Sequence, residues 1–121
     1  MMAEYAEALK RNGIDYDGAK ERFGGNAELY ERLALKFLDD THFAALEQAL
    51  AGGDVDTAVR EAHTLKGVAG NLSFAALYEA ASKVNAALRE GDLAGATALM
   101  DPVRSAHAAV VSALSSLRDA R

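Results

Sequence analysis

Cysteine and tryptophan are absent from the sequence, and proline occurs once in 121 residues. Without cysteine the chain has no disulfide framework, no zinc–thiolate site and no cysteine nucleophile. No apolar run approaches the roughly 20 residues of a membrane-spanning helix, and the polar N-terminus lacks the apolar core of a signal peptide. The formal net charge of −5 disfavours binding to the phosphates of a nucleic acid. We therefore expect a cytoplasmic protein without membrane insertion and without a nucleic-acid partner.

Alanine dominates what is present. It supplies 27 of the 121 residues, and hydrophobic residues make up 50% of the chain. Alanine is the best helix former and a poor strand former. The length fits the roughly 100–200 residues of one compact domain. The composition therefore predicts a single all-α domain over residues 1–121.

Glycines and capping residues divide the chain into segments with one apolar face each. Two short helices are expected within residues 2–23, ending at Asn12-Gly13 and Gly24-Gly25. The longer segments that follow are residues 26–51 with a bend point at 39–41, residues 54–72, residues 73–90 capped by Ser73, and residues 92–118. Pro102 lies in the last segment, where it either kinks the helix or forms with Asp101 the cap and start of a new one. Four such segments joined by short turns predict an antiparallel four-helix bundle over about residues 26–118.

The segment of residues 54–72 has the most regular pattern. Its apolar residues repeat at alternating spacings of three and four and form one stripe: Val55, Ala58, Ala62, Leu65, Ala69 and Leu72. His63 lies outside this stripe, so its side chain should project from the bundle. Lys66 and Gly67 follow one turn later, and Gly70 two turns later.

Two glycines inside a helix need a cause, because each costs about 1 kcal/mol relative to alanine. Gly67 and Gly70 would clear a shallow patch beside the imidazole of His63, on which another protein surface could lie. An imidazole is largely neutral at pH 7 and has a nucleophilic lone pair, and the ammonium group of Lys66 can offset charge on a phosphoryl group. This set of residues suits a phosphoryl acceptor. Most exposed helical histidines have no role, however, and the two glycines change that balance only modestly.

The segment Ala62-His63-Thr64-Leu65-Lys66-Gly67 resembles the His-x-Leu-Lys-Gly signature of histidine-containing phosphotransfer (HPt) domains. The resemblance extends to residues 13–15, 22–26 and 87–92, and so runs from Gly13 to Leu117. It implies a four-helix phosphorelay intermediate, which accepts a phosphoryl group from an aspartate on one receiver domain and passes it to an aspartate on another. Such a domain binds no ATP and is not a kinase.

The resemblance also implies roles for individual residues. His63 would attack phosphorus through Nε2, Lys66 would contact the phosphoryl group, and Gly67 would admit the receiver. Family members often place a glutamine or glutamate 22 residues after the histidine, where it holds the imidazole. Asn85 stands at that position and is one atom shorter in reach.

The docking surface for a receiver should be the cleared face around His63. Helical spacing gives as candidates Val59, Thr64, Gly67, Val68 and Gly70. Val59 and Val68 could equally be peripheral core, and core is favoured for Val59. Tyr5 and Leu9 either cover the end of the bundle or extend the docking surface.

The resemblance implies receiver domains and a hybrid sensor histidine kinase as partners, and one apolar face per helix predicts a monomer. No cofactor of its own is expected, because Mg²⁺ would belong to the partner receiver. Two alternatives stay open: a helical adaptor that binds a receiver or kinase without accepting phosphate, and the phosphoacceptor domain of a chemotaxis-type histidine kinase. The presence of the histidine with its lysine and glycine argues against a degenerate adaptor.

The remaining polar residues give weaker signals. Asp39 and His42 are i,i+3 neighbours without a third ligand, so no metal site is expected. His107 follows the core position Ala106 and has no patterned partner. The tyrosines are scattered singly and form no array on which bases could stack: Tyr5, Tyr16, Tyr30 and Tyr78.

Overall fold

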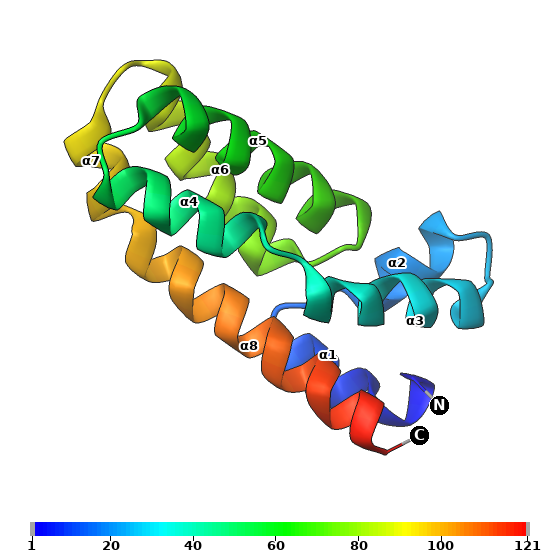
Figure 1. Cartoon of the computed structure of the whole chain (residues 1–121). Helices are drawn as coiled ribbons and strands as arrows, with labels where there is room; N and C mark the ends of the chain where they lie inside the picture. The colour runs from blue at the N-terminus through cyan, green and yellow to red at the C-terminus, as the bar shows by residue number, and fades with distance from the viewer. Residues whose placement is uncertain (1, 121) are drawn as a thin grey trace.

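The structure is a computed structural model that describes residues 2–120, and every regular element in that range is a helix (Figure 1). In chain order the elements are the 3₁₀ helix η1 (Met2–Tyr5), α1 (Ala6–Arg11), α2 (Tyr16–Arg22), α3 (Ala27–Lys36), the 3₁₀ helix η2 (Phe37–Asp39), α4 (His42–Ala51), α5 (Val55–Asn71), α6 (Ala75–Arg89), α7 (Leu93–Ala98) and α8 (Met100–Asp119). The predicted all-α class is confirmed. None of these helices combines the length and apolar character needed to cross a bilayer.

The helical bundle consists of α4, α5, α6 and the first part of α8 (Figure 1). Helices pack in the pairs α4–α5, α5–α6 and α6–α8, and short connections at residues 52–54 and 72–74 reverse the chain between neighbours. Helix α8 continues beyond the other three helices, and α1 and α3 pack against its C-terminal part (Figure 1). The bundle therefore has a second group of helices packed at one end.

The expected long helix over residues 26–51 is wrong, because the chain breaks completely where only a bend was expected. Asp40 has extended backbone angles, with φ −73° and ψ 135°, so it cannot continue a helix. Its carboxylate accepts a hydrogen bond from the backbone N–H of His42 at 2.9 Å. This local side-chain bond satisfies the start of α4 in place of a continuous helical ladder. Only α4 joins the bundle, and α3 belongs to the second group.

Ser73 does not cap α6 as the sequence predicted. Its φ is 57°, in the left-handed region, and Phe74 occupies the N-cap position without a side-chain hydrogen bond. The backbone N–H of Phe74 instead donates back to the carbonyl of Ala69 at 2.9 Å. Ser73 thus closes the C-terminus of α5, in a conformation that glycine usually takes.

Pro102 lies in the first turn of α8, after a separate short helix α7 has ended at Ala98. A proline is tolerated there because the first N–H groups of a helix have no partner inside it. Of the two predicted alternatives, the new helix is the one observed. Its N-cap is Leu99, so the predicted cap at Asp101-Pro102 is wrong by about two residues, and both of these residues lie inside the first turn.

The core follows the predicted stripe of α5 except at its first residue. Ala58, Ala62, Leu65 and Ala69 are fully buried, whereas Val55 is 37% exposed at the start of the helix. Many of the other core side chains are also alanines, and short side chains at a contact let helix axes approach closely. The abundance of alanine is therefore a packing feature of the bundle as well as a helix signal.

The N-terminal helices are attached to the turn between α5 and α6. The Tyr30 hydroxyl donates a hydrogen bond to the carbonyl of Leu72, and the Asp15 N–H donates to the carbonyl of Ser73 at 2.8 Å. Gly13 has a φ of 81°, and a Cβ on it would lie 2.6 Å from the Cβ of Ala76. Only glycine fits this close approach. These contacts fix α1–α3 against the end of the helix that carries His63.

Leu9 and Tyr5 both belong to this second group. Leu9 is 1% exposed, and Tyr5 is partly buried against the core. They therefore cover the end of the bundle, which was one of the two predicted alternatives.

Candidate functional site

The candidate site lies on α5, whose start is well defined. Asp54 is the N-cap residue, and its carboxylate accepts a hydrogen bond from the backbone N–H of Thr57 at 3.2 Å. Hydrogen bonds from Thr57 lower the pKa of Asp54 below its ordinary value, so the cap is ionised at neutral pH. Because the buried stripe of α5 faces α4 and α6, the remaining face of the helix points to solvent.

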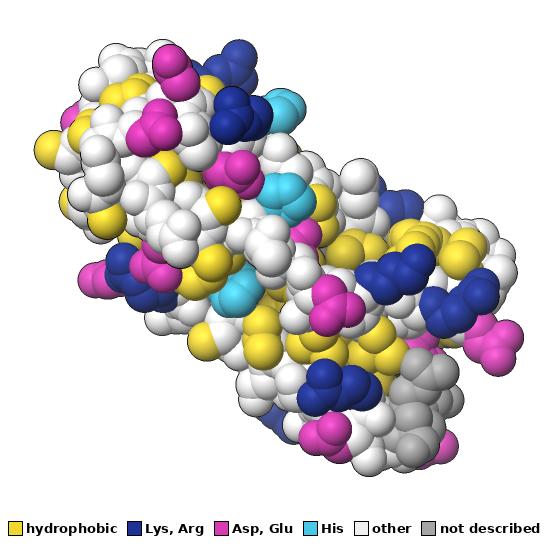
Figure 2. Space-filling model, viewed as in Figure 1, with side chains coloured by type: hydrophobic (Ala, Val, Ile, Leu, Met, Phe, Trp, Pro, Cys, Tyr) yellow, Lys and Arg dark blue, Asp and Glu magenta, His cyan; other side chains and the backbone are white. Residues whose placement is uncertain are grey.

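His63 lies on that solvent face and is exposed, as the sequence predicted. Lys66 is partly buried one turn later. Within the described part of the chain, neither side chain makes a hydrogen bond or an ion pair. The imidazole nitrogens and the ammonium group are therefore available to a ligand or partner. Histidine side chains reach the surface on the face shown in Figure 2.

Gly67 and Gly70 were grouped together in the sequence, but their surroundings differ. A Cβ on Gly67 would meet nothing within 4 Å, so packing within the protein does not require glycine there. A Cβ on Gly70 would lie 3.0 Å from Cδ1 and 3.1 Å from Cε1 of the Tyr78 ring. Gly70 therefore makes room for an aromatic ring of α6, and only Gly67 leaves open space beside His63.

The other candidates for docking lie at the edges of the same face. Val59 and Val68 are partly buried and pack against the core, so both contribute to peripheral packing. The hydroxyl of Thr64 donates to the carbonyl of Arg60 at 3.0 Å. Docking through these three residues stays a prediction.

Asn85 lies on α6 and is 2% exposed. Its Nδ2 is buried without a hydrogen-bond partner among the described residues, and no hydrogen bond joins Asn85 to His63. Orientation of the imidazole by Asn85 stays a prediction.

The other two histidines have partners that the sequence did not reveal. Nδ1 of His42 lies 2.9 Å from the Asp40 carboxylate, and the described residues include no group of three or more side chains that could hold a metal ion. His107 stacks on Phe43, with ring centroids 4.2 Å apart and an interplanar angle of 15°. Burial lowers the pKa of His107. The negative charges of Asp40 and Glu47 act to raise the pKa, but the effect of burial is larger. Because Phe43 is 64 positions away in the chain, no local pattern could have indicated this contact.

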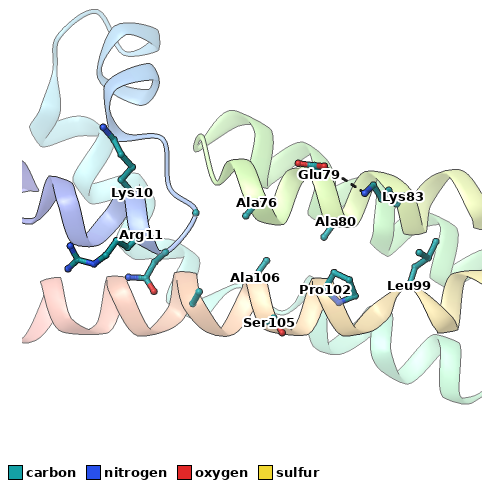
Figure 3. A pocket seen from close by; sticks show the side chains of 13 residues that line it. Lys10, Arg11, Ala76, Glu79, Ala80, Lys83, Leu99, Pro102, Ser105 and Ala106 are labelled. Carbon is teal, nitrogen blue, oxygen red and sulfur yellow. Dashed lines mark ion pairs between the residues drawn. The ribbon is translucent and has the colours of Figure 1, made fainter.

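Two grooves flank α6. The first, which we call the α6–α8 groove, has a volume of about 600 Å³ and is lined by alanines of both helices, with Lys10 and Arg11 at one end (Figure 3). The second, which we call the Lys66 groove, has a volume of about 930 Å³, and Lys66, Gly67 and Gly70 of α5 line it. Glu79 and Lys83 line both grooves, so this ion pair forms the ridge between them (Figure 3).

Comparison with known protein families identifies the bundle. The family model described as the Hpt domain matches residues 37–120, which include α4 to α8 and with them His63, Lys66, Gly67 and Asn85. The resemblance seen earlier in residues 13–36 lies outside the matched range. No curated protein and no solved structure matches the chain in the other two comparisons. Since the match spans most of the chain, the protein belongs to the Hpt domain family, the phosphotransfer carriers of two-component phosphorelays.

Proposed function

We propose that the protein is a phosphorelay intermediate in which His63 carries the phosphoryl group between two receiver domains. Nε2 of His63 attacks the phosphorus of an aspartyl phosphate on the first receiver. The N–P bond forms as the P–O bond to the aspartate breaks, and the electron pair of that bond returns to the carboxylate. Attack by an aspartate of a second receiver on the phosphohistidine reverses these changes. No net oxidation occurs, and no nucleotide takes part in either step.

The observation that carries this proposal is the combination of His63, Lys66 and Gly67 on the solvent face of α5. A partner aspartate must approach the imidazole within bonding distance, and Gly67 leaves the space one turn away empty. The ammonium group of Lys66, which has no ion pair within residues 2–120, can then offset charge on the phosphoryl oxygens. The Mg²⁺ that assists transfer would be held by the receiver, so His63 and Lys66 suffice on this side.

Phosphoryl transfer from a receiver tests the proposal directly. A receiver phosphorylated with acetyl phosphate should label the wild-type protein with acid-labile, base-stable phosphate. His63→Gln should abolish the label with helicity unchanged in circular dichroism, because His63 is exposed and makes no side-chain bond. His42→Gln is the matched control and should keep the label. Label that survives in His63→Gln would disprove the assignment.

The same assay separates the alternative functions. An adaptor would bind a receiver without acquiring label. The phosphoacceptor domain of a chemotaxis-type kinase would be labelled by a kinase with ATP and poorly by receivers. We expect receivers to be the efficient donors, and Lys66→Ala to slow labelling without blocking it, because the lysine stabilises charge and forms no bond to phosphorus.

A further inference from the structure

Tyr78 is one of two large hydrophobic side chains that stand out as exposed within the described part of the chain, the other being Val55. The exposed fraction of Tyr78 is 42%, although it belongs to α6, which otherwise contributes several fully buried residues to the core. Tyrosine is enriched at the centres of protein interfaces, since its ring supplies contact area at low conformational cost. The exposed ring of Tyr78 is therefore a candidate contact for a partner protein.

The ring is held against α5 by the absence of a side chain at Gly70. The ring carbons Cδ1 and Cε1 lie 3.0 and 3.1 Å from the place where a Cβ would stand, so a side chain at this position would require the ring to shift by a few tenths of an ångström. Gly70 follows His63 by seven residues, which is close to two full turns and places both on one face of α5. At 1.5 Å per residue the two positions are about 10 Å apart along the helix axis. The exposed ring of Tyr78 thus lies beside the face that presents the candidate phosphoacceptor.

The ring and the site residues also share the Lys66 groove. Lys66 and Gly67 line it from α5, Tyr78 and Lys83 from α6, and Arg22 from α2. A partner that reaches His63 over Gly67 would therefore meet the ring of Tyr78 along the same groove.

The charges of the groove favour an acidic partner. Lys83 is paired with Glu79 at 3.7 Å, and the Asp15 carboxylate accepts a hydrogen bond from the N–H of Gly18. Arg22 and Lys66 make no ion pair within residues 2–120. With Lys83 they outnumber the carboxylates of Asp15 and Glu79, so the lining carries one net positive charge in a chain whose formal net charge is −5. Opposite charges across an interface raise the association rate and fix orientation. A receiver that binds Mg²⁺ next to its aspartate carries carboxylates at the rim of its own site, which complements this groove.

We propose that Tyr78 is a docking anchor for the receiver domain, and that the Lys66 groove takes an acidic segment from the rim of the receiver's active site. This inference rests on the proposed function, because the receiver is the partner that function requires. Packing of an apolar receiver side chain on the Tyr78 ring would hold the partner, while Arg22 and Lys66 pair with its carboxylates. Tyr78 is then a positioning residue, which affects binding of the receiver and leaves the chemistry of the imidazole unchanged.

The test compares Tyr78→Ala with Tyr78→Phe and with Val55→Ala, the matched control at the other exposed hydrophobic side chain. Receiver domains are first screened for the one that binds the wild-type protein most tightly, whether or not it transfers a phosphoryl group. Its Kd for each variant and the KM and kcat of transfer are then measured. Phosphoramidate, a small donor that needs no docking surface, measures the reactivity of His63 separately.

We expect Tyr78→Ala to raise Kd and KM about tenfold, with kcat and phosphoramidate labelling close to wild type. Tyr78→Phe should bind the receiver like the wild type, because it keeps the ring. Val55→Ala should do so too, because Val55 lies at the start of α5 and the Tyr78 ring lies near its other end. Arg22→Ala should weaken binding at low salt and less so at high salt.

Receiver binding by Tyr78→Ala at the wild-type Kd would overturn the inference, and so would an equal loss in Val55→Ala. Loss of phosphoramidate labelling in Tyr78→Ala would also overturn it, because the ring would then act on the imidazole itself. Failure of the proposed function gives a different result: the receiver binds the wild-type protein and transfers nothing to His63. The Kd comparison decides the role of Tyr78 in that case too.

Discussion

Replacement of Gly67 by alanine should stabilise the protein and impair its function. Glycine inside a helix is less favourable than alanine by roughly 0.8–1.0 kcal/mol. The new Cβ would meet nothing within 4 Å, so no clash offsets this gain. For a chain of 121 residues, we expect the midpoint of thermal unfolding to rise by about 4 °C. Circular dichroism against temperature measures the change.

Phosphoryl transfer to the same variant should become slower. The added methyl group would stand one turn from His63, on the surface over which a receiver must approach. A shift of about 1 Å in the position of reacting groups can cost a factor of about 100 in rate. We expect kcat/KM for transfer from a phosphorylated receiver to fall at least about tenfold, while labelling by phosphoramidate stays near the wild-type rate.

Gly70→Ala provides the control, because its Cβ would press on the Tyr78 ring at 3.0 Å. Its gain in thermal stability should therefore be smaller than that of Gly67→Ala. A lower unfolding midpoint in Gly67→Ala would refute the predicted stabilisation, because it would mean that the space beside Gly67 is occupied. A stabilised variant that accepts phosphate from the receiver at the wild-type rate would refute the proposed role of Gly67 in clearing space for the receiver.

Two further predictions concern stability. Tyr30→Phe removes the hydroxyl that donates to the Leu72 carbonyl, so a buried acceptor loses its partner. The free energy of unfolding, measured with urea, should fall by about 1–3 kcal/mol. An unchanged midpoint would show that this bond does not hold α3 to the bundle. Burial lowers the pKa of His107 in the folded protein. The imidazole therefore binds a proton more readily in the unfolded chain than in the folded protein. The free energy of unfolding should fall as the pH drops through about 6.5. His107→Phe keeps a ring against Phe43 and should lose less stability than the wild type between pH 7.5 and 5.5 in thermal melts; equal losses would contradict the assignment.

The regular part of the fold was predictable because one physical pattern determines it. The stripe of α5 needs only alternating spacings of three and four, and it correctly separated the buried Leu65 and Ala69 from the exposed His63. Gly67 could be recognised for a similar reason, since a helix interior normally selects against glycine. Local spacing was sufficient for each of these residues.

The positions at which helices break depend on competition between two backbone conformations of the same residue. The spacing of apolar residues in the sequence does not show which conformation is adopted. Asp40 can either continue a helix or bind the N–H of His42, and the choice depends on whether α4 gains more by packing in the bundle. Ser73 adopts left-handed backbone angles because the turn requires them there, although glycine would do so at lower cost. At both positions the residue type allows two conformations, and the structure has the one that interrupts or ends a helix.

Contacts between distant segments account for what the sequence missed at the site. The pairs Phe43–His107 and Gly70–Tyr78 each join two helices. In neither pair do the neighbouring residues in the sequence indicate which residue the partner is. Tyr78 looked like an isolated aromatic until the structure placed its ring against a glycine of α5. The two glycines near His63 thus have different causes, and the sequence could not separate them.

The N-terminal helices lie outside the range matched by the family model, yet they are joined to the end of α5, the helix that carries His63. Tyr30 and Asp15 bond to the last residues of the α5–α6 turn, which fixes the end of α5 that borders the Lys66 groove. The same attachment places Arg22 at the groove, beside residues of the matched bundle. In the function that we propose, the chemistry of His63 depends on the bundle alone, whereas the charge of the groove also depends on α2. We therefore expect that residues before Phe37 can change the selection of a receiver without any change in the residues proposed to carry the phosphoryl group.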